Sequence, residues 1–258
     1  LTDIQGALLI LTKMLYSYYK KPVIILLDEY DVPVAKASSN GYYDAMLEIM
    51  RPMLSTVLKD NPSLRLAVIT GCLKIAKESI FTGTNNLVSD TIQSTHLNEY
   101  FGFTQADVDQ ILSDFHFERN KTLIKSWYDG FIFGKQKDIY NPWSITNYLD
   151  KKQLRPYWAD TSSNGLINRL IRQSSSEIKE RMEELLQGKE IVVNFDEQIV
   201  FEQLDQDENA IWSLMLASGY LKATDVEYRG VLREPWYHLM ITNLETTAMF
   251  SNLFKGWF

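Results

Sequence analysis

The chain has 258 residues, enough for one large domain or two smaller ones. An apolar fraction of 45% supports a hydrophobic core and excludes a disordered chain. The net charge of −7 excludes a general electrostatic surface for nucleic acid and leaves only a local basic patch open. The single cysteine, Cys72, allows no intrachain disulfide and indicates a reducing, cytoplasmic compartment. We find no signal peptide and no apolar run of membrane-spanning length, so no membrane association is expected.

Residues 2–21 predict an amphipathic helix, because apolar residues recur at helical spacing until Pro22. Five apolar residues follow at 23–27, a run typical of a strand buried on both faces of a parallel sheet. Asp28 and Glu29 come directly after this run. Ligands of open α/β sheets bind outside the carboxyl ends of the strands, so we expect both acids to face a ligand.

An apolar strand that ends in Asp-Glu has the form of a Walker B element. In this interpretation Asp28 holds Mg²⁺, directly or through water, and Glu29 polarises the water that attacks the γ-phosphate of ATP. The alternative is a buried strand followed by an acidic, solvated turn. For Asp31 alone, a turn or helix N-cap residue is the favoured interpretation.

A second core strand is predicted at residues 64–70, and it ends at Thr70-Gly71 beside the first strand end. Thr70 is positioned either to sense a γ-phosphate or hold the attacking water, or to satisfy local backbone groups. Helical spacing returns at residues 42–59 between the two strands. Pro52 should kink this helix or divide it in two.

Residues 72–80 predict a short helix, and a polar loop follows it. Lys74 and Lys77 either contribute positive charge to phosphates or are solvated helix charges. Asn85 and Asn86 are either turn formers or functional amides, and the sequence leaves their role open.

The predicted elements of the second half of the chain are mainly helical, unlike those of the first, and we place a domain boundary near residues 101–104. Residues 1–103 then form an α/β core and residues 104–258 a mainly helical lid with a winged-helix-like end. Helix N-caps are expected at Thr104 and Asn141, the latter followed by Pro142. The other expected elements are a weak strand at 91–97, a hairpin at 131–140, helices at 163–173, 176–187 and 207–219, a strand at 190–195, a hairpin at 220–224 and 236–241 with a long polar connection, and a helix at 243–258.

A phosphate-binding loop is missing from the sequence. No Gly-x-x-x-x-Gly-Lys-Ser/Thr pattern occurs, and only 22 residues precede Val23. Because the chain starts at Leu1 rather than at methionine, we expect this loop upstream, if the protein has one. ATP and Mg²⁺ are expected as cofactors only in that case. The three histidines lack metal-ligand spacing, and no Gly-x-Ser-x-Gly hydrolase elbow occurs.

Several segments together resemble a known family. They are residues 25–33, Thr70-Gly71 with residues 77–87, residues 101–104, residues 127–131 with 133–134, residues 140–144, and the closing residues 241–245 and 256–258. In this order they resemble the AAA-ATPase-like family of bacterial proteins, which are AAA+/STAND-related P-loop ATPases usually followed by a PD-(D/E)XK nuclease domain. No Asp…Glu-x-Lys nuclease set occurs in the chain itself.

The resemblance implies an α/β ATPase core, a helical lid and a winged-helix-like unit. It implies Asp28 as the Mg²⁺ carboxylate, Glu29 as the water-activating base and Thr70 as a sensor of the nucleotide. It also implies that Asn141 and Pro142 pack near the nucleotide.

Two hypotheses follow. The first is an AAA+-like ATPase module that acts as a nucleotide-gated switch for an attached, C-terminal nuclease-like effector. The second is a non-catalytic protein-interaction or nucleic-acid-associated module that does not bind nucleotide. The sequence leaves the biological partner, DNA binding, the oligomeric state and ATP hydrolysis open.

Overall fold

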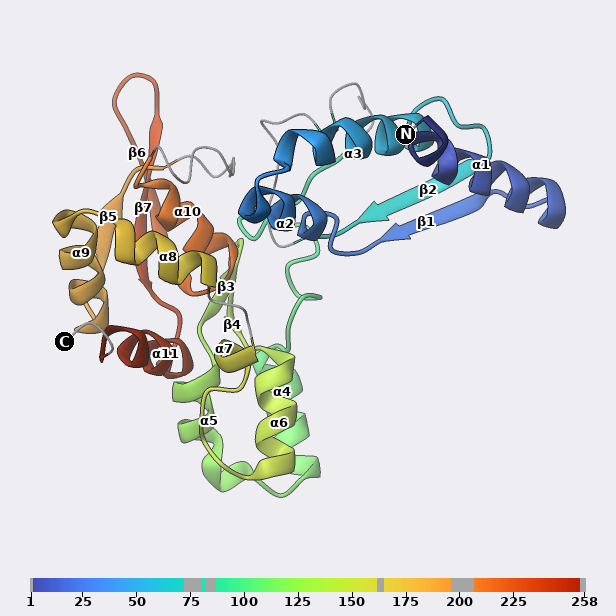
Figure 1. Cartoon of the computed structure of the whole chain (residues 1–258). Helices are drawn as coiled ribbons and strands as arrows, with labels where there is room; N and C mark the ends of the chain where they lie inside the picture. Colours follow the sequence, from blue (N-terminus) through green and yellow to red (C-terminus); the bar gives the residue numbers. More distant parts are fainter. Residues whose placement is uncertain (1, 72–79, 82–86, 162–164, 196–206, 256–258) are drawn as a thin grey trace. The chain divides into compact units, whose positions relative to one another are not determined.

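A computed structural model describes residues 2–71, 80–81, 87–161, 165–195 and 207–255 of the protein (Figure 1). The chain separates into two compact units, one with the described residues up to Ser89 and one with those from Asp90 onward. The sequence places the domain boundary somewhat later, near residues 101–104, and that limit stays a prediction. No helix in the described ranges has both the length and the apolar character needed to cross a bilayer.

The first unit is a parallel strand pair with helices. Its elements are α1 (Thr2–Tyr19), β1 (Val23–Leu27), α2 (Val32–Asn40), α3 (Tyr43–Leu58) and β2 (Leu64–Ile69). β1 pairs in parallel with β2, and α2 and α3 form the connection between the two strands. α1 packs along α3, and these two helices contact β1 and β2 respectively (Figure 1). The α/β class expected from the sequence is confirmed.

The expectation that the first strand is buried on both faces is wrong. Exposure alternates along β1, because Ile24 and Leu26 are 51% and 76% exposed while Val23, Ile25 and Leu27 are half-buried. Only one face of the strand pair is therefore covered by the residues that the structure describes. A run of apolar residues cannot reveal this, because the same five side chains suit a strand with one or two covered faces.

Pro52 does not divide the helix that contains it. α3 runs from Tyr43 to Leu58 without interruption. A proline lacks the N–H that would bind the carbonyl four residues earlier, which here belongs to Glu48. The side-chain amide of Gln5 in α1 donates to that carbonyl at 3.0 Å. The neighbouring helix thus satisfies the carbonyl that Pro52 leaves without its helical donor.

The second unit is mainly helical and carries two small antiparallel sheets. Its first part consists of α4 (Gln105–Asp114), the 3-10 helix η1 (Glu118–Asn120), α5 (Lys121–Tyr128), β3 (Phe131–Phe133), β4 (Gln136–Ile139), α6 (Pro142–Lys151) and α7 (Trp158–Thr161). Its second part consists of α8 (Gly165–Gln173), α9 (Ser176–Leu186), β5 (Ile191–Val193), α10 (Ala210–Ala217), β6 (Leu221–Arg229), β7 (Glu234–Ile241) and α11 (Leu244–Lys255). The three-stranded sheet has the order β5-β7-β6.

Local capping chemistry sets the helix starts that the sequence predicts. Thr104 forms a complete capping box with Asp107 at the start of α4. The side chain of Asn141 accepts hydrogen bonds from the first N–H groups of α6, where Pro142 is the first residue. Both expected N-caps are confirmed.

Two other expectations in this unit are wrong. Residues 91–97 form turns rather than a strand, in keeping with their polar composition. The β6–β7 hairpin has a short connection at residues 230–233, because both strands continue through the stretch expected as a long polar loop. Gly230 and Arg233 both have positive φ angles, which allow the tight reversal.

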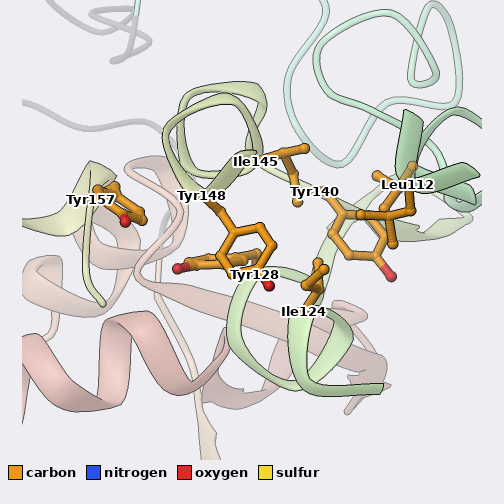
Figure 2. Packing of buried hydrophobic residues seen from close by; sticks show 8 residues of the cluster. Leu112, Ile124, Tyr128, Tyr140, Ile145, Tyr148 and Tyr157 are labelled. Carbon is orange, nitrogen blue, oxygen red and sulfur yellow. The ribbon is translucent and has the colours of Figure 1, made fainter. Parts of the chain in front are cut away.

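A tyrosine-rich core holds the helices of the first part of this unit together (Figure 2). Its buried members are Val108, Leu112, Ile124, Tyr128, Tyr140, Ile145, Tyr148 and Tyr157. Each tyrosine hydroxyl has a hydrogen-bond partner at 2.6–3.0 Å; for example, Tyr140 donates to the side chain of Gln105 at 2.7 Å. The rings thus contribute apolar area while their polar ends stay satisfied. Burial raises the pKa of Tyr140 to about 12.

Glu245, at the start of α11, is a fully buried carboxylate that joins three helices. It accepts hydrogen bonds from the Ser144 hydroxyl of α6 at 2.8 Å and from the N–H groups of Tyr157 and Trp158 at 2.6 and 2.7 Å. The two N–H groups lie at the start of α7. Burial raises the pKa of Glu245, and the hydrogen bond from Ser144 partly offsets this effect. Loss of the carboxylate would leave buried donors without an acceptor.

We expect Glu245→Ala to lower the free energy of unfolding by about 3 kcal/mol, because it leaves buried donors unpaired. Glu245→Gln should cost less, since its oxygen still accepts from the backbone and its amide donates to Ser144. Urea unfolding followed by tryptophan fluorescence measures both. Glu183→Gln, an exposed position of α9, is the matched control. Equal midpoints for Glu245→Ala and the control would contradict this role.

Candidate functional site

The carboxyl ends of β1 and β2 meet at one edge of the strand pair. Thr70 donates its N–H to the carbonyl of Leu27 at 2.9 Å, and the N–H of Tyr30 donates to the carbonyl of Thr70 at 3.1 Å. The hydroxyl of Thr70 also donates to Oδ1 of Asp28. The structure therefore brings together Asp28 and Thr70, the two strand-end residues that the sequence selected.

Glu29 lies in the turn that links β1 to α2. Its φ angle of +54° lies in the left-handed region, which a residue with a Cβ adopts at a cost. Its N–H donates to Oδ1 of Asp28 at 3.0 Å, and its carbonyl accepts from the N–H of Val32 at 3.1 Å. These two bonds hold the turn, and the Glu29 side chain remains exposed beside Asp28.

A carboxylate such as that of Asp28 could contribute to a hard-cation site that other ligands complete. Asp28 is exposed, and within the described residues no group donates to its second oxygen, Oδ2. Mg²⁺ is commonly held by one or two carboxylates together with phosphate oxygens and water. The described part of the chain contains no group of three or more acidic, histidine or cysteine side chains arranged to hold a metal. Asp28 and Glu29 could therefore supply only part of a Mg²⁺ site, and phosphate oxygens or water would have to supply the rest.

Asp31 and Gly71 form a close contact that the sequence did not reveal. Asp31 is 3% exposed and occupies the N-cap position of α2, as expected, but its side chain makes no capping hydrogen bond. It lies against Gly71 instead. A Cβ atom at Gly71 would lie 2.6 Å from Oδ1 of Asp31 and 2.7 Å from the ring of Tyr30. Glycine therefore permits the two strand-end turns to approach each other. The position of Gly71 just after a strand end was the one sequence feature that could have indicated this contact.

The remaining predicted site residues are not part of this edge as described. Four of them, Lys74, Lys77, Asn85 and Asn86, lie outside the described residues. So does the helix expected at 72–80, except for its last residue, Ile80, which lies in a turn. Asn141 and Pro142 belong to the second unit, where the oxygen of Asn141 accepts from two N–H groups of α6. Contact of these two residues with a nucleotide stays a prediction.

The second unit contains a charged network around Lys125, and one of its members, Asp129, lies in a segment that carries the family resemblance. Lys125 donates to Asp129 and Asp138 at 2.8 Å each, and to the side chain of Gln105 at 2.9 Å. Burial lowers the pKa of Lys125, but its hydrogen bonds to the two carboxylates outweigh this and raise it. Burial raises the pKa of Asp129. This network ties α5 to the β3–β4 hairpin, and we assign it a structural role.

Comparison with known proteins supports the resemblance for the first unit. Residues 2–81 match the AAA-ATPase-like family, described as a predicted AAA-ATPase. Asp28, Glu29 and Thr70 lie inside the matched range, whereas Asn141 and Pro142 lie outside it. The family resemblance expected from the sequence is thus confirmed over residues 2–81.

One relative extends over most of the chain. An uncharacterized protein in the vnfD 5′ region of Azotobacter chroococcum mcd 1 is 26% identical over 227 residues. The aligned region covers 88% of this chain but only 41% of that protein, so the chain spans less than half the length of its relative. No solved structure matches the chain.

The contact at Gly71 gives a test of the site's packing. We expect Gly71→Ala to lower the free energy of unfolding by about 1–3 kcal/mol, because the new methyl group would collide with Asp31 and Tyr30. Gly6→Ala is the control, since a Cβ there meets only Ile10, at 4.0 Å. The control should be neutral or stabilising within α1, by up to about 1 kcal/mol. Urea unfolding of both variants measures the difference, and a Gly71→Ala protein as stable as the control would contradict the contact.

Proposed function

We propose that this chain supplies the Mg²⁺-binding and water-activating part of an AAA+-like ATPase. The observation that carries the proposal is the hydrogen bond from Thr70 to Asp28 across the carboxyl ends of two adjacent parallel strands. Ligands of α/β sheets bind at such ends. The match of residues 2–81 to a predicted AAA-ATPase family supports the same assignment.

Each side chain has a defined role in this proposal. Asp28 would hold Mg²⁺, which neutralises charge on the phosphates of ATP when it is bound. Glu29, whose exposed carboxylate follows Asp28 in the sequence, would accept a proton from the attacking water. Thr70 fixes the orientation of Asp28 through its hydroxyl and would report the state of the γ-phosphate.

The proposal requires a phosphate-binding loop from another part of the same polypeptide. Phosphates are held by backbone N–H groups and a lysine, in a pattern that these 258 residues do not contain. We therefore assign ATP and Mg²⁺ binding to the longer protein. In that protein the nucleotide state would switch an attached effector, for which a C-terminal nuclease-like domain is the expected candidate.

We propose that the end of the second unit has a winged-helix-like fold and that it binds another protein rather than DNA. The support is the succession of α9, β5, α10, β6 and β7 with the strand order β5-β7-β6. Residues 211–216 of α10 are all buried, so this helix is not available to enter a DNA groove. The hairpin tip instead exposes Val231 and Leu232 by 100% and 84%, which suits an apolar partner surface.

Turnover of Mg·ATP by the full-length protein tests the catalytic assignment. Glu29→Gln should retain Mg·ATP binding and lower turnover by about 10²–10⁴-fold, the usual contribution of a general base. Asp28→Ala should weaken binding of Mg·ATP more than binding of ATP without metal, because it removes the metal carboxylate. Calorimetry and phosphate release measure the two effects.

Glu48→Gln is the matched control for these variants. Its side chain is exposed on α3, in the same unit, and only its backbone carbonyl has a described structural role. It should bind and turn over ATP like the unmodified protein. Unchanged Mg·ATP binding and turnover in both Asp28→Ala and Glu29→Gln would refute the ATPase assignment and favour a non-catalytic module.

A further inference from the structure

Tyr30 follows the two acids of the candidate site, and its side chain, unlike theirs, is buried. Asp28 and Glu29 are exposed, whereas Tyr30 is 8% exposed. The ring lies directly against Gly71, where an added Cβ would be 2.7 and 2.8 Å from two ring carbons. It also packs on the ring of Phe81, with the two centroids 5.3 Å apart. The ring therefore ties the turn after β1 to residues that follow β2.

The backbone of Glu29 needs support on both sides. A positive φ angle in a residue with a Cβ persists only where the surrounding structure imposes it. On the N-terminal side, the N–H of Glu29 donates to Oδ1 of Asp28 at 3.0 Å. On the C-terminal side, the N–H of Tyr30 donates to the carbonyl of Thr70 at 3.1 Å. This second bond requires the backbone of residue 30 to stay beside the end of β2, and the buried ring holds it there.

Asp28 has an anchor of its own that does not involve the ring of Tyr30. Its Oδ1 accepts from the hydroxyl of Thr70. The N–H of Thr70 in turn donates to the carbonyl of Leu27 at 2.9 Å, so this anchor belongs to the strand pairing itself. Loss of the ring should therefore change the direction of the Glu29 side chain more than the position of Asp28. The two carboxylates can be separated by a substitution at residue 30.

We infer that Tyr30 is a positioning residue, which directs the carboxylate of Glu29 by packing its ring between Gly71 and Phe81. The inference rests on the proposed function, in which Glu29 is the base. In that reaction the water oxygen bonds to the γ-phosphorus, a water proton passes to Glu29, and ADP leaves with the electrons of the broken P–O bond. A displacement of a reacting group by about 1 Å is enough to lower such a rate about 10²-fold.

Kinetics of the full-length protein with Mg·ATP test the inference. Tyr30→Ala keeps the N–H of residue 30 and removes the ring. It should lower kcat about 10- to 100-fold and change the Kd of Mg·ATP by less than about twofold, because Asp28 keeps its anchor. Tyr30→Phe keeps the ring and should restore kcat. Tyr16→Ala, at an exposed tyrosine of α1, is the matched control and should change neither quantity. Turnover is expressed per folded molecule, with the folded fraction taken from urea unfolding.

A double-mutant cycle separates positioning from mere packing. If Tyr30 acts through Glu29, adding Tyr30→Ala to Glu29→Gln should lower kcat by less than about a further twofold, because the group that it directs is already absent. A purely structural role gives the same factor in both backgrounds and would overturn the inference. If Tyr30→Ala does not fold, Tyr30→Leu, which keeps a buried apolar side chain without the ring, takes its place in the cycle with the same expected results.

Other outcomes distinguish the inference from the proposed function. An unchanged kcat in Tyr30→Ala, or a loss of Mg·ATP affinity as large as the loss of kcat, would overturn the positioning role. With a low kcat in Glu29→Gln, the proposed function would survive that result. An unmodified kcat in Glu29→Gln would instead refute the role of Glu29 as the base, and the role of Tyr30 with it.

Discussion

The parallel pairing of β1 with β2 is the constraint on which the candidate site depends. It brings two carboxyl ends together, so that residues 42 positions apart, Asp28 and Thr70, form a hydrogen bond. The turns beyond the strands are then held by backbone bonds and by the close approach of Gly71 to Asp31. Within the described residues, one face of the same strand pair is apolar and exposed.

The second unit depends on a different kind of interaction. Glu245 and Ser144 are 101 residues apart, and their hydrogen bond joins the last helix of the described chain to α6. The same carboxylate accepts hydrogen bonds from the N–H groups of Tyr157 and Trp158 at the start of α7. One buried acid therefore fixes three helices. The tyrosine core beside it follows the same rule, with apolar rings buried and hydroxyls satisfied.

Local signals made much of this fold predictable. Thr104 and Asn141 specify helix starts through bonds to their own neighbours, and the capping pattern is visible in a few residues. The meeting of Asp28 with Thr70 was also predictable, because adjacent parallel strands end at the same edge. The features that the sequence did not reveal depend on distant residues. The donor for the Glu48 carbonyl, four residues before Pro52, is Gln5 of α1. The exposure of β1 depends on what packs against the sheet. No short sequence window contains that information.

The left-handed backbone of Glu29 has a consequence for protein engineering. A non-glycine residue in this region costs about 1–2 kcal/mol relative to glycine, which adopts it freely. Selection for thermal stability alone would therefore favour glycine or asparagine at this position, and each replacement would remove the carboxylate. If Glu29 activates water as we propose, the most stable version of this turn is an inactive one. Stability and activity are then opposed at a single residue, and a stabilised variant of this protein should keep position 29 fixed.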